Sequence, residues 1–170
     1  MPHTLRARFK PTPVDYMNAT LAFFFAQRSM ILLAIISTLF VVMAVPISLI
    51  YRAQGSTVAT FILLIALGYL LIAVATVAAP LIRIRRVAMQ NETMLAETTW
   101  SIDAERIDVR NRYEKTELVW GMFNWLIVTR QFVLLVYAEN KRQFTFLPKR
   151  AFSSQADQTA FLRLAKEKLA

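Results

Sequence analysis

The 170-residue sequence contains no cysteine and a single histidine, and both scarcities remove classes of site. Without cysteine there is no disulfide, no cysteine-ligated zinc or iron–sulfur cluster and no thiol nucleophile. The one histidine, His3, has no second histidine to share a metal with, and we interpret it as a solvated terminal side chain. We therefore predict no catalytic residue, no metal ligand and no cofactor, and we expect the protein not to be an enzyme.

Charged side chains are missing from two long apolar segments, Met30–Tyr51 and Val58–Ile82. A helix rises about 1.5 Å per residue and a bilayer core is about 30 Å thick, so roughly 20 apolar residues cross it. A helix also satisfies its own backbone hydrogen bonds in lipid. The sequence therefore predicts transmembrane helices at 30–51 and 58–82, joined in a hairpin by a short external loop at 52–57. Two buried core helices of a soluble protein are the alternative, but so short a chain could hardly cover them.

Most of the net charge of +9 flanks these segments, since residues 87–170 hold twelve basic and ten acidic side chains. So balanced a domain has no basic patch for nucleic acid, and we expect no nucleic-acid partner. Cations beside membrane spans mark the cytoplasmic side and attract anionic lipids. The flanking cations are interpreted as topology anchors at the membrane surface: Arg28, Arg83, Arg85 and Arg86. The sequence thus predicts a multi-pass protein of the inner (plasma) membrane, in contact with membrane lipids, with both termini cytoplasmic.

Small residues recur at helical spacing within the two segments, as Ala44 and Ser48 do in the first and Ala59 and Ala66 in the second. Such residues let helices approach closely. They serve either to pack the hairpin internally or to pair chains into a homo-oligomer. The hydroxyl groups can bond back to carbonyls of their own helix, so they do not require a transport pathway.

Residues 1–29 are expected to form a cytoplasmic strand followed by an amphipathic helix. Apolar and basic side chains alternate in Leu5–Lys10, which is typical of a strand. Thr12 is placed to cap a helix that begins at Pro13, with Asp15 three residues after the cap. Whether the strand joins the C-terminal sheet stays open, although an exposed strand edge would gain a pairing partner.

Residues 87–170 change to short alternating runs separated by turns, which predicts a meander of antiparallel strands. Phe132–Tyr137 is apolar on both faces and should be the central strand. Pro148 ends the last strand, and Ser153 or Ser154 then caps a final helix, with Asp157 completing the capping box. We expect strands at 98–102, 106–112, 117–120, 126–128, 132–137 and 143–147. The fold class is therefore α+β, a two-helix membrane hairpin with a small antiparallel-sheet domain closed by a helix.

This layout resembles the YcxB-like bacterial membrane proteins. The resemblance rests on a few stretches: Pro13-Val14-Asp15-Tyr16, the two-span hairpin, Trp120, Thr129 with Phe132-Val133-Leu134-Leu135, and Phe146-Leu147 before Pro148-Lys149-Arg150-Ala151-Phe152. The last of these is similar to the family's PKRAF element. The family often carries Glu before that Thr, where this chain has Val128. The resemblance implies a pleckstrin-homology-like C-terminal domain and no assigned activity.

The PKRAF element has two interpretations. Structurally, Pro148 ends a strand, Ala151 and Phe152 fill the corner between sheet and helix, and the two cations are solvated or bond neighbouring carbonyls. Functionally, Lys149 and Arg150 would bind an acidic headgroup or a carboxylate of a partner. We expect a non-enzymatic membrane protein whose cytoplasmic domain binds a protein partner or anionic lipid headgroups. The alternative is an accessory subunit of a membrane enzyme or transporter, acting as an oligomer or hetero-complex.

Overall fold

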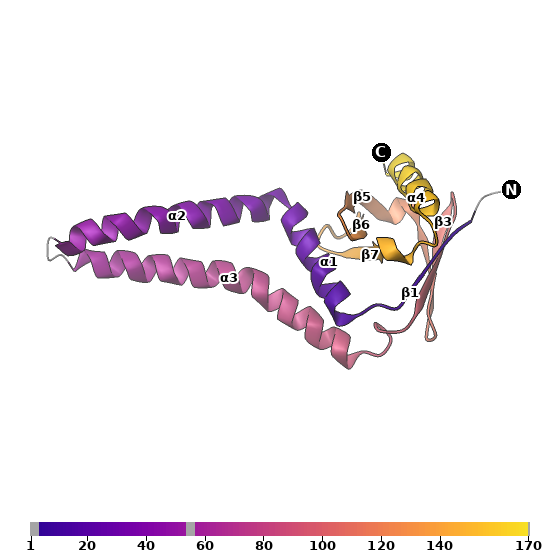
Figure 1. Cartoon of the computed structure of the whole chain (residues 1–170), viewed down its shortest axis with the longest axis horizontal. Helices are drawn as coiled ribbons and strands as arrows, with labels where there is room; N and C mark the ends of the chain where they lie inside the picture. The colour runs from indigo at the N-terminus through magenta and orange to yellow at the C-terminus, as the bar shows by residue number, and fades with distance from the viewer. Residues whose placement is uncertain (1–3, 54–56, 170) are drawn as a thin grey trace. The chain divides into compact units, whose positions relative to one another are not determined.

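The computed structural model describes residues 4–53 and 57–169, and over these residues the chain forms four α-helices and seven strands (Figure 1). The helices are α1 (Pro13–Ala26), α2 (Arg28–Ala53), α3 (Val58–Gln90) and α4 (Gln155–Lys168). The strands are β1 (Leu5–Phe9), β2 (Thr98–Ile102), β3 (Arg106–Arg110), β4 (Lys115–Val119), β5 (Phe123–Val128), β6 (Phe132–Tyr137) and β7 (Phe144–Pro148). His3, which we interpret as solvated, and the middle of the predicted loop at 52–57 lie outside the described residues.

The chain divides into two compact units. One, which we call the helix-pair unit, is Phe24–Arg83, and the other, the sheet unit, comprises Met1–Phe23 and Ile84–Ala170. The sheet unit is therefore assembled from both ends of the sequence. The predicted domain at 87–170 lacked this N-terminal portion.

In the helix-pair unit, α2 and α3 are both long and apolar enough to cross a membrane. Only 11% of the most apolar window of each helix is buried, which is unlike the core helix of a soluble protein. Both helices outrun their uncharged segments, since α2 begins at Arg28 and α3 continues past Ile82 to Gln90.

The two helices run side by side (Figure 1), and the rings of Phe40 and Tyr69 lie 5.5 Å apart. Small residues of the predicted stripes are buried within this unit: Ala44, Ser48, Ala59 and Ala66. Their burial agrees with internal packing of the hairpin. The hydroxyls bond back as expected, with Ser37 Oγ 2.6 Å from the carbonyl of Leu33 and Thr76 Oγ1 2.8 Å from that of Ile72.

The N-terminal strand joins the C-terminal sheet. β1 pairs antiparallel with β2, from Leu5 opposite Ile102 to Phe9 opposite Thr98. The four-stranded sheet has the order β1-β2-β3-β4. In sequence, therefore, α1 and the apolar helix pair are inserted between two neighbouring strands of one sheet.

The expectation of one small sheet was wrong, because the strands form two. A second sheet has the order β5-β6-β7, and β6 is its central strand as predicted. The chain leaves the first sheet at a 3-10 turn, Trp120–Met122, so Trp120 is not the strand residue that was expected. Its side chain is buried, and Nε1 donates to the carbonyl of Asp103 at 3.0 Å. An alternating pattern shows that strands exist, but it does not show where a meander changes sheets.

The core of the sheet unit lies between the two sheets and helices α1 and α4. Every residue of β6 from Phe132 to Val136 is buried, as are the inward residues of β1 and β2. Ser154 caps α4, accepting from the backbone N–H of Asp157 at 3.1 Å, which confirms the predicted cap. The buried face of α4 contributes Phe161 and Ala165. From α1, the Phe23 ring stacks on Phe144 with centroids 4.6 Å apart.

Candidate functional site

The start of α1 is held to the turn that follows β7 by one ion pair. Asp15 Oδ2 accepts from the backbone N–H of Thr12 at 2.9 Å and from its hydroxyl at 2.8 Å. The same oxygen lies 2.6 Å from Nη2 of Arg150. The Asp15 side chain is 6% exposed and that of Arg150 is 57% exposed, so the carboxylate is buried and the guanidinium reaches it from the surface.

This ion pair fixes the charge of Asp15. Burial by itself would raise the pKa of the Asp15 carboxyl, but the hydrogen bonds from Arg150 and Thr12 outweigh burial and lower its pKa. The pKa of Arg150 is raised in turn, chiefly by its hydrogen bond to Asp15. The pair is therefore ionised at neutral pH.

Tyr16, the next residue of α1, makes a second long-range hydrogen bond. Its hydroxyl donates to the carbonyl of Met94 at 2.8 Å, in the segment that follows α3. Its ring meets Phe146 edge-on, with centroids 5.0 Å apart. Burial, with a smaller contribution from the Asp15 charge, raises the pKa of Tyr16 to about 12. The phenol therefore stays protonated, as a donor must.

The PKRAF element forms the corner between β7 and α4. Pro148 is fully buried and ends β7, while Lys149–Ala151 make a 3-10 turn. Ala151 is buried, and Phe152 packs its ring 5.3 Å from that of Phe161. The Phe152 backbone also bridges to Ala7 of β1. These contacts are consistent with the structural interpretation of Pro148, Ala151 and Phe152.

The two cations of the element have different environments. Arg150 is engaged by Asp15, a carboxylate of its own chain. The side chain of Lys149 has no ion pair or hydrogen bond to any described residue, and its backbone N–H donates to the carbonyl of Gln131 at 2.8 Å. That bond brings the exposed turn at Arg130 beside the element. Lys149 and Arg130 are the cations here that remain open to an acidic ligand, whereas the predicted contact through Arg150 would have to share its guanidinium.

Sequence reasoning missed the Asp15–Arg150 pair. From the sequence, Asp15 is expected only to cap a helix, and the expected partners of Arg150 are solvent, neighbouring carbonyls or a ligand. The two residues stand 135 positions apart, and no local spacing reports such a contact. The available signal was that the same family resemblance covered both stretches.

The predicted topology anchors are all exposed. Arg28 begins α2, and Arg83, Arg85 and Arg86 lie on the last turns of α3. None of the four forms an ion pair with another described residue. They are free to meet water or lipid headgroups.

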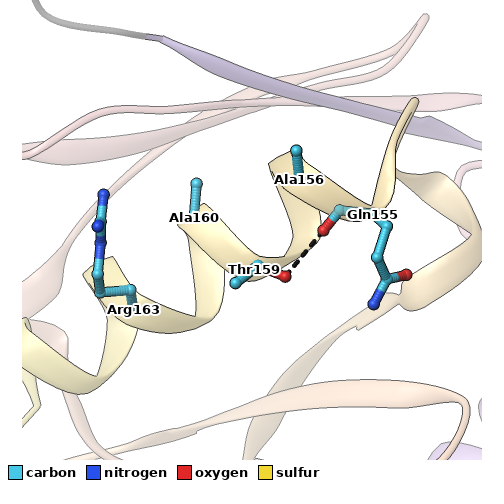
Figure 2. A pocket seen from close by; sticks show the side chains of 5 residues that line it. All are labelled: Gln155, Ala156, Thr159, Ala160 and Arg163. Carbon is cyan, nitrogen blue, oxygen red and sulfur yellow. Dashed lines mark hydrogen bonds between the residues drawn. The ribbon is translucent and has the colours of Figure 1, made fainter.

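The described cavities do not gather charged groups of different elements around a reaction centre. A hollow of about 380 Å³ lies along one face of α4. Figure 2 shows the five side chains that line it: Gln155, Ala156, Thr159, Ala160 and Arg163. The hydroxyl of Thr159, one of the lining residues, donates a hydrogen bond to the carbonyl of Gln155 at 2.9 Å. Because all five residues come from one helix, this hollow is a surface feature of α4.

A model of the family described as YcxB-like protein matches residues 102–165, from the last residue of β2 into α4. The match includes the PKRAF element and confirms the resemblance to YcxB-like proteins over these residues. No curated protein and no solved structure matches the chain.

Proposed function

We propose that the protein is a membrane-anchored binding module. α2 and α3 cross the inner membrane as a hairpin, both termini lie in the cytoplasm, and the sheet unit binds an acidic group of a partner protein or of lipid headgroups. The observation that carries the proposal is the insertion of an apolar helix pair between β1 and β2. Both ends of the pair thus lead into one folded unit, which holds that unit at the membrane.

The exposed surface of α2 and α3 supports the membrane part. Most of the large apolar side chains that the chain exposes lie on these two helices. Contiguous apolar surface of this extent is unfavourable in water, and lipid would cover it. α3 has 33 residues, so it is about 50 Å long, well beyond a bilayer core of about 30 Å. The part of α3 that extends beyond the bilayer core carries Arg83, Arg85 and Arg86, whose charges can contact anionic headgroups.

The domain architecture supports the binding part. A four-stranded and a three-stranded antiparallel sheet with a C-terminal helix agree with the pleckstrin-homology-like fold that the family resemblance implies. A fold of this kind does not fix a ligand. The cations left open beside the PKRAF element, Lys149 and Arg130, favour an acidic group.

The experiment is photo-crosslinking in intact membranes with a photoreactive residue in place of Lys149. Arg150 is not replaced, because its exchange would remove the ion pair with Asp15. A matched probe at Lys141, an exposed cation in the β6–β7 turn, measures background. A protein adduct specific to position 149 supports a protein partner, and phospholipid adducts specific to it support headgroup binding. Equal labelling at both positions, or none at 149, contradicts binding at this surface.

A further inference from the structure

The two sheets have four edge strands, and three of them are protected against pairing with another chain. β1 carries Arg6 and Arg8 and is bridged at Ala7 by Phe152. β4 carries Lys115 and Glu117. β7 ends in Pro148, and its aromatic side chains are covered by those of α1. Charge, proline and covering by another element are the usual means of protecting an edge.

β5 lacks the first two of these protections, charge and proline. Its sequence, FNWLIV, contains no charged residue and no proline. A bulge between Phe123 and Trp125 interrupts its first residues, but Trp125–Val128 pairs with β6 in unbroken register. β5 lies at the end of its sheet, with β6 on one side only. It therefore presents a regular, uncharged edge four residues long.

The outward backbone groups of this edge can be assigned. The N–H of Thr129 donates to the carbonyl of Phe132 at 2.9 Å, so this pair points inward, toward β6. Antiparallel strands alternate between hydrogen-bonded and non-hydrogen-bonded pairs. Ile127 opposite Leu134 is thus the next bonded pair, while Leu126 and Val128 direct their N–H and C=O groups away from β6.

One residue of this edge, Val128, is an exposed large apolar side chain. Within residues 91–169, the large apolar side chains that are exposed are Tyr113, Val119, Met122 and Val128. Three of them lie on the continuous segment from the end of β4 to the end of β5. Val119 and Met122 line a hollow with residues of the β6–β7 turn, so Val128 is the one of the three that lies on the free edge. A free strand edge with an exposed apolar side chain can pair with another chain.

We infer that β5 pairs with β5 of a second copy of this chain, joining two three-stranded sheets into one of six strands. Charge favours a second copy at this edge, because self-pairing of β5 opposes no like charges. Self-pairing of β1 would bring its arginines together, in a protein whose net charge is already +9. The pairing is isologous, each copy using the same surface. It rests on the proposed function in one respect, since anchoring in one membrane raises the local concentration of copies.

The register follows from the outward groups. With Ile127 opposite Ile127 of the second copy, Leu126 faces Val128 in both directions, and both outward residues of each copy form hydrogen bonds. Ile127 is then a non-hydrogen-bonded pair, whose Cα atoms lie about 4.5 Å apart, within the range of a disulfide. Because the natural chain has no cysteine, one introduced cysteine gives a disulfide without background.

The experiment oxidises the full-length Ile127→Cys protein in native membranes and separates it on a non-reducing gel. We expect a disulfide-linked dimer at least fivefold above that of Glu117→Cys, the matched variant on the β4 edge. Adding Val128→Pro should reduce the dimer about fivefold, because it removes an outward N–H that β6 does not use. The Tm of the double variant, compared with that of Ile127→Cys, verifies folding.

Leu126→Cys reports an alternative register, in which that residue opposes itself, and its disulfide would also support pairing through β5. The inference is overturned if neither cysteine forms a dimer above the β4 control, or if Val128→Pro leaves the dimer unchanged in a folded protein. Extraction of the same membranes with alkaline carbonate separates the two proposals. Release of the chain contradicts membrane anchoring, whereas repeating the oxidation on the released protein still tests the β5 pairing.

Discussion

Nη2 of Arg150 lies 2.6 Å from Oδ2 of Asp15, and this contact joins the first turn of α1 to the turn before α4. The carboxylate is buried, and it also accepts two hydrogen bonds from Thr12. Both residues belong to the sheet unit, to which the two ends of the sequence contribute. The pair therefore helps to hold the N-terminal portion on the C-terminal one.

Arg150→Met should destabilise the sheet unit by about 1–2 kcal/mol, because a buried carboxylate loses a charged hydrogen-bond donor. Lys149→Met, the neighbouring cation without an ion pair, should change the free energy of unfolding by less than about 0.5 kcal/mol. Thermal unfolding of the detergent-solubilised protein measures both. A double-mutant cycle with Asp15→Asn should show coupling, and additive effects would contradict the contact.

The contribution of the pair should depend on pH in one direction. Since the pKa of Asp15 is lowered in the folded state, its ion pair stabilises the protein above the ordinary carboxyl pKa of about 4, and this stability is lost as the pH falls through the folded pKa. The Tm difference between the natural chain and Arg150→Met should be greatest near pH 7 and shrink below about pH 4. A difference that stays constant down to pH 3 would contradict this assignment.

Ionisation of the Tyr16 phenol should lower the stability of the folded protein at alkaline pH. Its pKa is raised to about 12, so the folded state keeps the phenol neutral while the unfolded chain ionises it from about pH 10. Stability from Tyr16 is fully present below pH 10 and is lost as pH rises toward 12. Tyr16→Phe should lower the free energy of unfolding by about 1 kcal/mol at pH 7, because it removes the hydrogen bond to Met94. As the pH rises toward 12, this variant should lose less stability than the natural chain does. Absorbance at 295 nm follows the phenol directly.

The sheet unit should require β1. A fragment beginning at residue 87 would leave the edge of β2 without its partner strand and the core without Leu5, Ala7 and Phe9. We expect this fragment to lack dispersed amide resonances, and a chain that links residues 1–23 to 84–170 through a flexible glycine–serine segment to show them. A folded 87–170 fragment of equal Tm would contradict the split architecture.

Sequence patterns correctly predicted the helices and strands that are determined by residues close together in the chain. Uncharged length marked α2 and α3, the alternation in Leu5–Lys10 marked β1, and Ser154 with Asp157 marked the start of α4. The apolar sequence of Phe132–Tyr137 correctly placed it at the centre of a sheet, since only a strand covered on both faces can bury every side chain.

What sequence reasoning missed depends on contacts between distant residues. The division into two sheets is set at Trp120, whose indole is fixed by the carbonyl of Asp103. The environment of Arg150 is set by Asp15, at the other end of the chain. Neither contact has a signature at short spacing.

The most direct test of membrane anchoring uses two single cysteines in this cysteine-free chain, Arg52→Cys near the end of α2 and Glu167→Cys on α4. Intact bacterial cells that express each variant are treated with a membrane-impermeant maleimide, before and after permeabilisation. We expect position 52 to be labelled in intact cells and position 167 to be labelled only after permeabilisation. Labelling of both positions under the same condition would contradict a hairpin that crosses the membrane with a cytoplasmic sheet unit.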